Sequence, residues 1–154
     1  SSISVGCGSA PLPAPFPGTE IAGLTALINL ELRACYLSQQ PASNLAALDT
    51  MTQLQKIRLD ANPGITGNLS DVFPQGLSPA RFPALNVIHA QQTPLGGQIP
   101  AGLTQFGNAP SFRLFQARFS GTLPATGNSS ILELAINGNA LEGVLPDYIR
   151  NASG

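Results

Sequence analysis

The chain has no tryptophan and little charge. Its 154 residues include seven Lys and Arg against eight Asp and Glu, and charged residues make up only 10% of the total. A protein that binds nucleic acid or an anionic membrane surface needs a dense basic field, so the composition argues against both classes. The two cysteines lack Cys-x-x-Cys spacing and cannot make the usual zinc site. No run approaches the roughly 18 apolar residues of a membrane span.

Glycine and proline are abundant instead, with 16 and 14 residues, as expected where turns recur. The length suits one domain or a few turns of an elongated array. The chain begins at Ser1 without Met and shows no signal peptide, so we interpret it as processed or incomplete. It ends at Gly154 soon after a good repeat, and a stack of coils needs both ends covered. We therefore expect further protein after this residue.

The clearest pattern runs from Ile131 to Pro146. Counted from Ile131, apolar residues stand at offsets 0, 3, 5, 10 and 14, with Asn at offset 8, Gly at offset 12 and Pro at offset 15. This spacing recurs upstream and indicates stacked coils rather than one central core. The second register carries one inserted residue, and the first loses the Gly and Ile-Pro positions. The five registers start at Leu27, Leu54, Leu85, Ala109 and Ile131.

Each offset has a mechanical use. Residues at offsets 3 and 5 alternate inward along a short strand, as a period of two requires. The Asn at offset 8 (Asn62, Asn139) stands where the chain turns inward, so we expect its amide to satisfy buried backbone groups. Thr93 and Cys35 could partly replace this Asn, whereas Ala117 could not. The later Gly and Pro shape a second extended segment and its exit.

The pattern resembles leucine-rich repeats over roughly residues 27 to 150. The Gly-x-Ile-Pro or Gly-x-Leu-Pro element in three registers is similar to the plant-specific subclass. That subclass occurs in receptor-kinase ectodomains, polygalacturonase-inhibiting proteins and algal or protist surface proteins. The resemblance implies a right-handed, mainly β solenoid with short 3-10 or α segments, a parallel sheet on its concave side and a second short strand beside it. Its motif is specific for the fold and weak for function.

Two regions are expected, a Pro-rich lead-in and cap over residues 1–26 and an array of about five coils over residues 27–154. The family's usual N-terminal cap has paired Cys and a Trp. This chain has no Trp, and only Cys7 precedes the repeats, so its cap must differ. The segment Pro11 to Pro17 is polyproline-like. It is either a stiff lead-in over the first coil or a proline tract for a partner or for modification.

The outward positions of the concave sheet collect the scarce charge, including five of the seven basic residues and three acids. Any soluble sheet must keep its open face polar, so plain solvation is one reading and ligand binding the other. Guanidinium groups pair bidentately with carboxylates or sulfates, and aromatic side chains add contacts to a peptide or sugar. The candidate ligand-binding residues are Arg33, Tyr36, Lys56, Arg58, His89, Arg113, Phe115 and Arg118.

We expect no catalysis, no cofactor and no metal. The single histidine, His89, has Asp60 on the neighbouring coil, so a Ser-His-Asp grouping is conceivable. No Gly-x-Ser-x-Gly, phosphate-loop or metal-spacing motif accompanies it. We expect His89 to be an exposed sheet residue.

Cys7 and Cys35 have two readings. A bond between them would staple the lead-in onto the first coil, and an oxidising compartment would permit it. Alternatively, Cys35 is a buried thiol and Cys7 pairs with protein beyond this sequence.

Three Asn-x-Ser sequons, at Asn68, Asn128 and Asn151, lie off the concave strands. Glycans there would leave the sheet open, and the alternative is ordinary polar loop asparagines. Together with the single lysine and the subclass-like repeats, the sequons favour secretion.

The primary hypothesis is a non-catalytic extracellular module that binds a protein, peptide or cell-wall glycan through the concave sheet. The alternative is a structural subunit of a wall, coat or appendage, assembled by packing of repeats. Neither reading involves nucleic acid or a membrane span within this chain.

Overall fold

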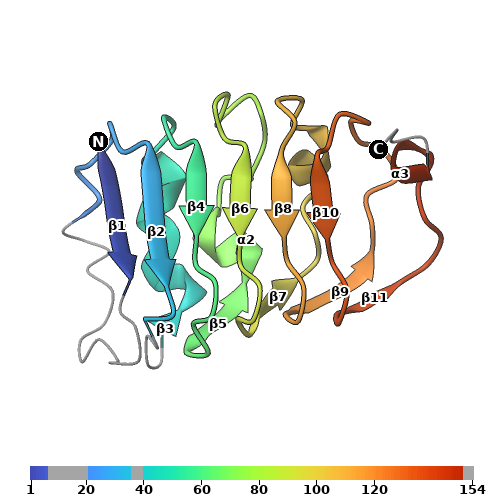
Figure 1. The fold of residues 1–154 in the computed structure, drawn as a ribbon, viewed down its shortest axis with the longest axis horizontal. Helices are drawn as coiled ribbons and strands as arrows, with labels where there is room; N and C mark the ends of the chain where they lie inside the picture. Colours follow the sequence, from blue (N-terminus) through green and yellow to red (C-terminus); the bar gives the residue numbers. More distant parts are fainter. Residues whose placement is uncertain (7–20, 36–39, 151–154) are drawn as a thin grey trace.

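The computed structural model describes residues 1–6, 21–35 and 40–150. Six parallel strands form the larger sheet, each beside the next along the stack (Figure 1). Those after the first come from successive coils. The strands are β1 (Ser2–Gly6), β2 (Asn29–Arg33), β4 (Lys56–Arg58), β6 (Val87–His89), β8 (Ser111–Arg113) and β10 (Glu133–Ala135).

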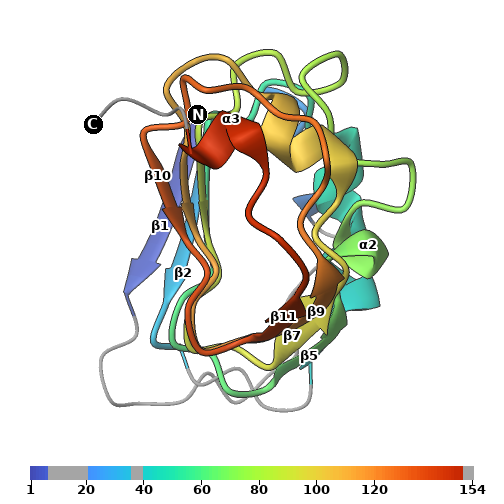
Figure 2. The same cartoon turned by 90° about the vertical axis from the view of Figure 1, so that its right-hand side faces the viewer.

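Five further strands form a second parallel sheet, in which each strand follows the turn that ends a coil's first strand (Figure 2). They are β3 (Gln40–Pro41), β5 (Ile65–Asn68), β7 (Leu95–Gly97), β9 (Arg118–Thr122) and β11 (Ala140–Glu142). Gly96 is required here, because a Cβ at this position would collide with the carbonyl of Arg118 on the adjacent strand.

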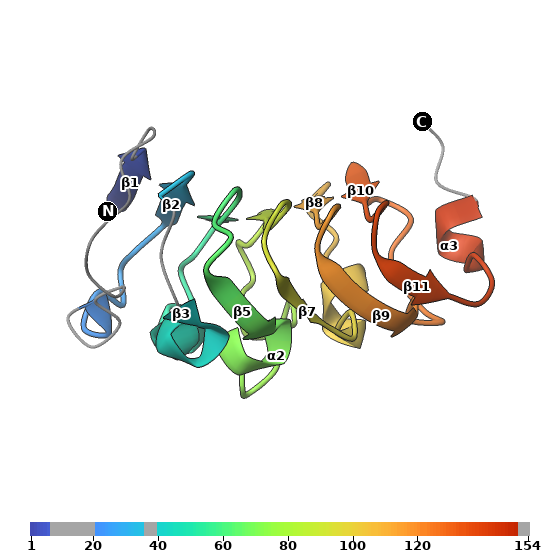
Figure 3. The same ribbon diagram turned by 90° about the horizontal axis from the view of Figure 1, so that it is seen from below.

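Short helices complete the coils. The 3-10 helices η1 (Ala42–Thr50) and η2 (Ala101–Gln105) and the α-helix α2 (Leu69–Val72) lie on the side opposite the larger sheet, and α3 (Asp147–Arg150) follows the last coil. The larger sheet lines the gently concave side of the stack (Figure 3). Such helical returns fit where Pro41 and Pro100 precede η1 and η2, since proline is tolerated at a helix start but not inside it.

The inward register is confirmed. Leu30, Ile57, Ile88, Phe112 and Leu134 stand opposite one another across the larger sheet. The first four are buried, and Leu134 is half-buried against the same core. Burying each such side chain contributes about 1.5–3 kcal/mol, which makes this row a main source of stability.

The fourth coil departs from the expected start. Ala109 was expected inside at offset 0, but it is exposed and has a left-handed φ of 49°. Phe106 is buried instead and packs against Phe112 in a T-shaped arrangement, with ring centroids 6.1 Å apart. A large aromatic ring three residues earlier fills the volume that Ala109 was expected to fill.

The asparagines act as expected. Asn62 accepts a hydrogen bond from the N–H of Cys35 and donates to the carbonyls of Leu32 and Leu59. Asn139 accepts from Phe119 N–H and donates to the carbonyls of Leu114 and Ile136. Each amide thus serves the preceding coil as well as its own, so the first and fourth coils, which lack this Asn, are satisfied by their neighbours.

Thr93 is a partial substitute, as expected. Its hydroxyl donates to the carbonyl of Ala90, 2.6 Å away, inside the third coil. A hydroxyl has one proton where an amide has two, so it serves fewer carbonyls.

A left-handed residue ends the concave segment of every coil. Its φ lies between 49° and 71° at Ala34, Ala61, Gln92, Gln116 and Gly138. Only at Gly138 does the sequence indicate this conformation, because glycine adopts a positive φ readily. The other four bear a strain of about 1–2 kcal/mol each, and each donates its N–H to a carbonyl of the next coil. Inter-coil hydrogen bonding therefore holds the turn where local preference opposes it.

The N-terminal segment adds a strand that the sequence did not predict. β1 pairs in parallel with β2 from Ser2 opposite Asn29 to Gly6 opposite Arg33. Together the two sheets, the coil returns and the aligned interior define a leucine-rich repeat solenoid, as predicted. None of the helices in the described part of the chain has the length and apolarity to cross a lipid bilayer.

Candidate functional site

The outward side of the larger sheet, here called the concave face, presents three rows of side chains. The middle row is Glu31, Arg58, His89, Arg113 and Ala135. It is flanked by Asn29, Lys56, Val87, Ser111 and Glu133 on one side, and by Arg33, Asp60, Gln91, Phe115 and Asn137 on the other.

The charges of the first two coils pair with one another across the strands. Arg58 lies 3.9 Å from Glu31 and 3.4 Å from Asp60. Lys56 lies 3.3 Å from Glu31, and Arg33 donates from Nε to Asp60 over 3.1 Å. A ligand carboxylate or sulfate would therefore compete with a resident carboxylate for these cations. The pair of Lys56 with Glu31 is partly exposed and contributes little stability, about 0–1 kcal/mol.

A second network joins the last three coils. Arg113 Nε donates to both carboxylate oxygens of Glu133, each 2.9 Å away. The hydroxyl of Ser111 donates to Glu133 over 2.7 Å, and Nε2 of His89 lies 3.1 Å from the same hydroxyl. The bond from Ser111 is the main reason that the pKa of Glu133 falls below its ordinary 4.5.

The expectation that His89 is exposed is wrong, because only 7% of the residue is accessible. It stands on the concave face between Arg58 and Arg113, whose long side chains flank it on the neighbouring strands. Burial, followed by the positive charges of Arg58 and then Arg113, lowers the pKa of His89 below 6.5. The imidazole is therefore neutral at pH 7.

Ser111, His89 and Glu133 do not form a nucleophilic triad. In a triad the histidine accepts the serine proton and the acid holds the other ring nitrogen. Here the Ser111 hydroxyl donates its hydrogen bond to Glu133. The Ser111 oxygen therefore accepts from Nε2–H of His89. Nδ1 of His89 has no hydrogen-bond partner. The arrangement positions polar groups without activating the serine.

Four residues at the centre of the concave face, here called the central patch, hold buried polar atoms that lack hydrogen-bond partners. They are Arg58 (Nε), Asp60 (Oδ1), His89 (Nδ1) and Gln91 (Oε1). Arg58 Nε and Asp60 Oδ1 attract each other as an ion pair at 3.4 Å, but without hydrogen-bond geometry. Buried polar atoms are nearly always satisfied, so this cluster of exceptions is unusual. Neighbouring side chains cover each of these atoms almost completely, so a ligand reaches them only when those side chains move.

The central patch was only partly predicted. Arg58 and His89 were candidate ligand-binding residues, whereas Asp60 was considered only as a neighbour of His89 and Gln91 was not a candidate. Asp60 and Gln91 are only 6% and 9% accessible, and the pattern of a single repeat does not encode this burial.

Arg118 is a further correction. It was expected on the concave face but begins β9 in the second sheet. The left-handed turn at Gln116 ends the concave segment before Arg118 is reached. Phe115 does lie on the concave face, half-buried after β8. Tyr36 lies outside the described residues.

The predicted modification sites are only partly visible. Asn68 is exposed at the end of β5, and Asn128 is half-buried in a loop, where its side chain accepts a hydrogen bond from Ser130 N–H. Asn151 and Cys7 lie outside the described residues, so glycosylation of Asn151 and the bond between Cys7 and Cys35 stay predictions. Within the described ranges, no three His, Cys, Asp or Glu residues gather in a way that could hold a metal ion.

No family model matches the chain, and no curated protein matches it. Solved structures do. The plant peptide hormone receptor RGFR1 in complex with RGF2 is similar over 87% of the chain, with 21% identity and a TM-score of 0.66. The Arabidopsis receptor kinase HAESA, solved with the peptide hormone IDA and the co-receptor SERK1, is similar over 86%, with 16% identity and a TM-score of 0.65. A plant ice-binding protein matches over 82%, with 20% identity and a TM-score of 0.54.

These likenesses support the leucine-rich repeat fold. The chain spans only 20%, 25% and 46% of the lengths of these three structures. They do not determine which subclass of repeat this is.

Proposed function

We propose that this protein is a non-catalytic recognition module that binds an extended peptide, free or as part of a partner protein, across the concave face. Two of the similar structures are a plant peptide hormone receptor in complex with RGF2 and a receptor kinase in complex with the peptide hormone IDA. The observation that carries the proposal is the central patch, where a guanidinium, a carboxylate, a neutral imidazole and an amide each keep one polar atom without a hydrogen bond.

A peptide backbone supplies what this patch lacks. Once the side chains that cover these atoms move aside, its N–H groups can donate to His89 Nδ1, Asp60 Oδ1 and Gln91 Oε1, and its carbonyls can accept from Arg58 Nε. A glycan hydroxyl can also donate, but a backbone presents donors and acceptors in fixed alternation along one direction. The central-patch residues span two adjacent coils, and that span favours an extended ligand.

The test is a library of short peptides displayed on phage and selected on the wild-type protein. A selected peptide is then measured by calorimetry against Gln91→Ala and His89→Ala, with Arg150→Ala as the matched control. Arg150 pairs only with exposed Asp147 on α3, away from the sheet. We expect each patch variant to weaken binding about tenfold, as lost hydrogen bonds to buried groups do. Selected peptides that bind all variants equally would refute the site, and so would binding of plant cell-wall oligosaccharides alone.

The proposal includes an extracellular setting, with glycans at Asn68, Asn128 and Asn151 and a bond between Cys7 and Cys35. Asn68 and Asn128 both lie off the concave face, so glycans there would leave the peptide path open. Expression in a secreting eukaryotic cell followed by mass spectrometry of the glycopeptides and of the non-reduced protein tests each site. Recovery of unmodified asparagines and two alkylated thiols would count against this setting.

The second candidate is a structural subunit assembled through repeat packing. Its motivating observation is the apolar surface of the last coil, where Leu132 and Val144 are 74% and 82% exposed. Sedimentation of the purified protein separates the two candidates. Filaments or large assemblies support the structural role, whereas a stable monomer that binds peptide supports recognition.

A further inference from the structure

Arg118 differs from every other basic side chain. In the part of the chain that the structure describes, Arg33, Lys56, Arg58, Arg81, Arg113 and Arg150 each form an ion pair with an acid. Arg118 is exposed, and its side chain forms no ion pair or hydrogen bond with a described residue. Where charge is scarce and the other basic side chains are all paired, an unpaired guanidinium is a candidate anion site.

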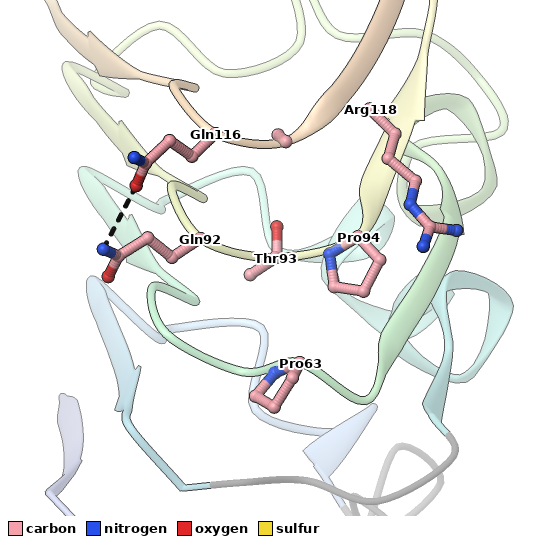
Figure 4. Close-up of a pocket in the computed structure, with 7 residues that line it drawn as sticks. Pro63, Gln92, Thr93, Pro94, Gln116 and Arg118 are labelled. Carbon is pink, nitrogen blue, oxygen red and sulfur yellow. Dashed lines mark hydrogen bonds between the residues drawn. The ribbon is translucent and has the colours of Figure 1, made fainter. Parts of the chain in front are cut away.

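Arg118 also borders a hollow. An open depression of about 370 Å³ crosses three coils and is lined by Pro63, Gln92, Thr93, Pro94, Gln116, Ala117 and Arg118 (Figure 4). The volume falls in the range of small ligand sites. Arg118 stands at one end of the hollow, and Gln92 and Gln116 stand at the other.

The hollow has an apolar part, a polar end formed by two glutamine amides and a cationic end formed by Arg118. Pro63 and Pro94 have no N–H to donate, so their rings present apolar surface. At one end Gln92 Nε2 donates to Gln116 Oε1 over 3.2 Å, which leaves Gln92 Oε1 and Gln116 Nε2 available to a ligand. No side chain of β7 stands directly beside Arg118, because its partner in the ladder is Gly96. The guanidinium therefore remains open to a carboxylate.

We propose that this hollow is a second peptide-binding site, distinct from the concave face, for an extended segment with an apolar residue followed closely by an acidic one. The apolar side chain lies on the rings of Pro63 and Pro94, and the carboxylate takes a bidentate pair of hydrogen bonds from Arg118. Gln92 and Gln116 hold the peptide backbone. The site does not depend on the central patch.

The test uses acetylated Phe-Ala-Asp amide, with Phe-Ala-Asn amide as the uncharged match, titrated into isotopically labelled protein. Arginine Nε–H signals are followed by NMR. We expect the aspartate peptide to shift the Arg118 signal and to bind about tenfold more tightly than the asparagine peptide, as a charge-assisted pair requires. Arg118→Gln should remove this preference. Arg150→Gln and His89→Ala, which leave the hollow intact, should preserve it.

Equal affinity for the two peptides, or an unchanged preference in Arg118→Gln, would overturn the proposal. A sulfated oligosaccharide that binds through Arg118 while neither peptide binds would overturn it as well, because it would assign the anion site to a glycan. Pro63→Ser tests how much the apolar contact contributes to peptide affinity, separately from the contact with Arg118. It should weaken Phe-Ala-Asp amide but leave the weaker binding of acetylated Gly-Ala-Asp amide unchanged. Because His89→Ala disables the central patch only, failure here is distinguishable from failure of the concave-face site.

Discussion

The second and fifth coils share one motif but bury it to different extents. In the second coil Ile57, Leu59 and Asn62 are fully enclosed, whereas the equivalent Leu134, Ile136 and Asn139 of the fifth coil are half-buried. The fifth coil nevertheless matches the repeat pattern best, and the second carries an inserted residue. The second coil packs between two others, while the described chain places a coil on one side of the fifth only. Burial in a stack is thus set by neighbours rather than by how well one repeat follows the pattern.

The largest expected difference concerns a charge placed inside each coil. Ile57→Asp should cost about 4 kcal/mol or more and abolish cooperative folding, because the carboxylate has no partner or water in a site that is 1% exposed. Leu134→Asp should cost about 2 kcal/mol, since its carboxylate stays partly hydrated. Urea unfolding followed by circular dichroism measures both. Equal losses would show that the two coils are equally dry, and would contradict the claim that the fifth coil is less enclosed than the second.

A smaller difference is expected at the asparagines. Asn62→Ala leaves the Cys35 N–H and the Leu32 and Leu59 carbonyls unpaired in the interior, and should cost about 3 kcal/mol. Asn139→Ala removes the three equivalent bonds but should cost about 1 kcal/mol, because water can replace the amide at a half-buried site.

Thr93→Val is the matched control for the asparagine variants. It removes a single bond, to the carbonyl of Ala90, and should fall between the two asparagine variants or below both. If Asn139→Ala proves as costly as Asn62→Ala, Asn139 in the last coil is as enclosed as Asn62 in the second.

The inward rows and the asparagine roles were predictable because both follow from local periodicity and from backbone groups that must be satisfied. Three features were not. The left-handed turns at Ala34, Ala61, Gln92 and Gln116 oppose local preference and depend on hydrogen bonds from the next coil. Phe106 fills the interior position that the repeat spacing assigned to Ala109, because its large ring occupies the available volume. The burial of His89 comes from arginines on neighbouring strands, so it could not be found by aligning repeats one at a time.

The smallest expected effects are pH-dependent and fall in different windows for the two regions. The pKa of His89, in the third coil, lies below its unfolded value of 6.5, mainly through burial. The unfolded state therefore binds more protons between these values, and stability should decrease as pH falls from about 7 through 6.5. The pKa of Glu133, in the fifth coil, lies below 4.5, mainly through the Ser111 hydroxyl. Its contribution is present above 4.5 and is lost as pH falls further.

Melting temperatures measured across this pH range test both windows. His89→Gln should flatten the first decrease, and Glu133→Gln should flatten the second. A single decrease shared by both variants would show that one coupled network, rather than two separate regions, titrates.

The inward and outward sides of one strand give the most direct test of the account, because Ile88 and His89 are adjacent in β6 and both are almost fully buried. Urea unfolding of Ile88→Asp and His89→Asp compares a carboxylate in the apolar interior with one placed between Arg58 and Arg113 on the concave face. We expect a loss of about 4 kcal/mol for Ile88→Asp and a change within about 1 kcal/mol for His89→Asp. Similar losses for the two variants, or a larger loss for His89→Asp, would contradict the register on which both the fold and the proposed binding face depend.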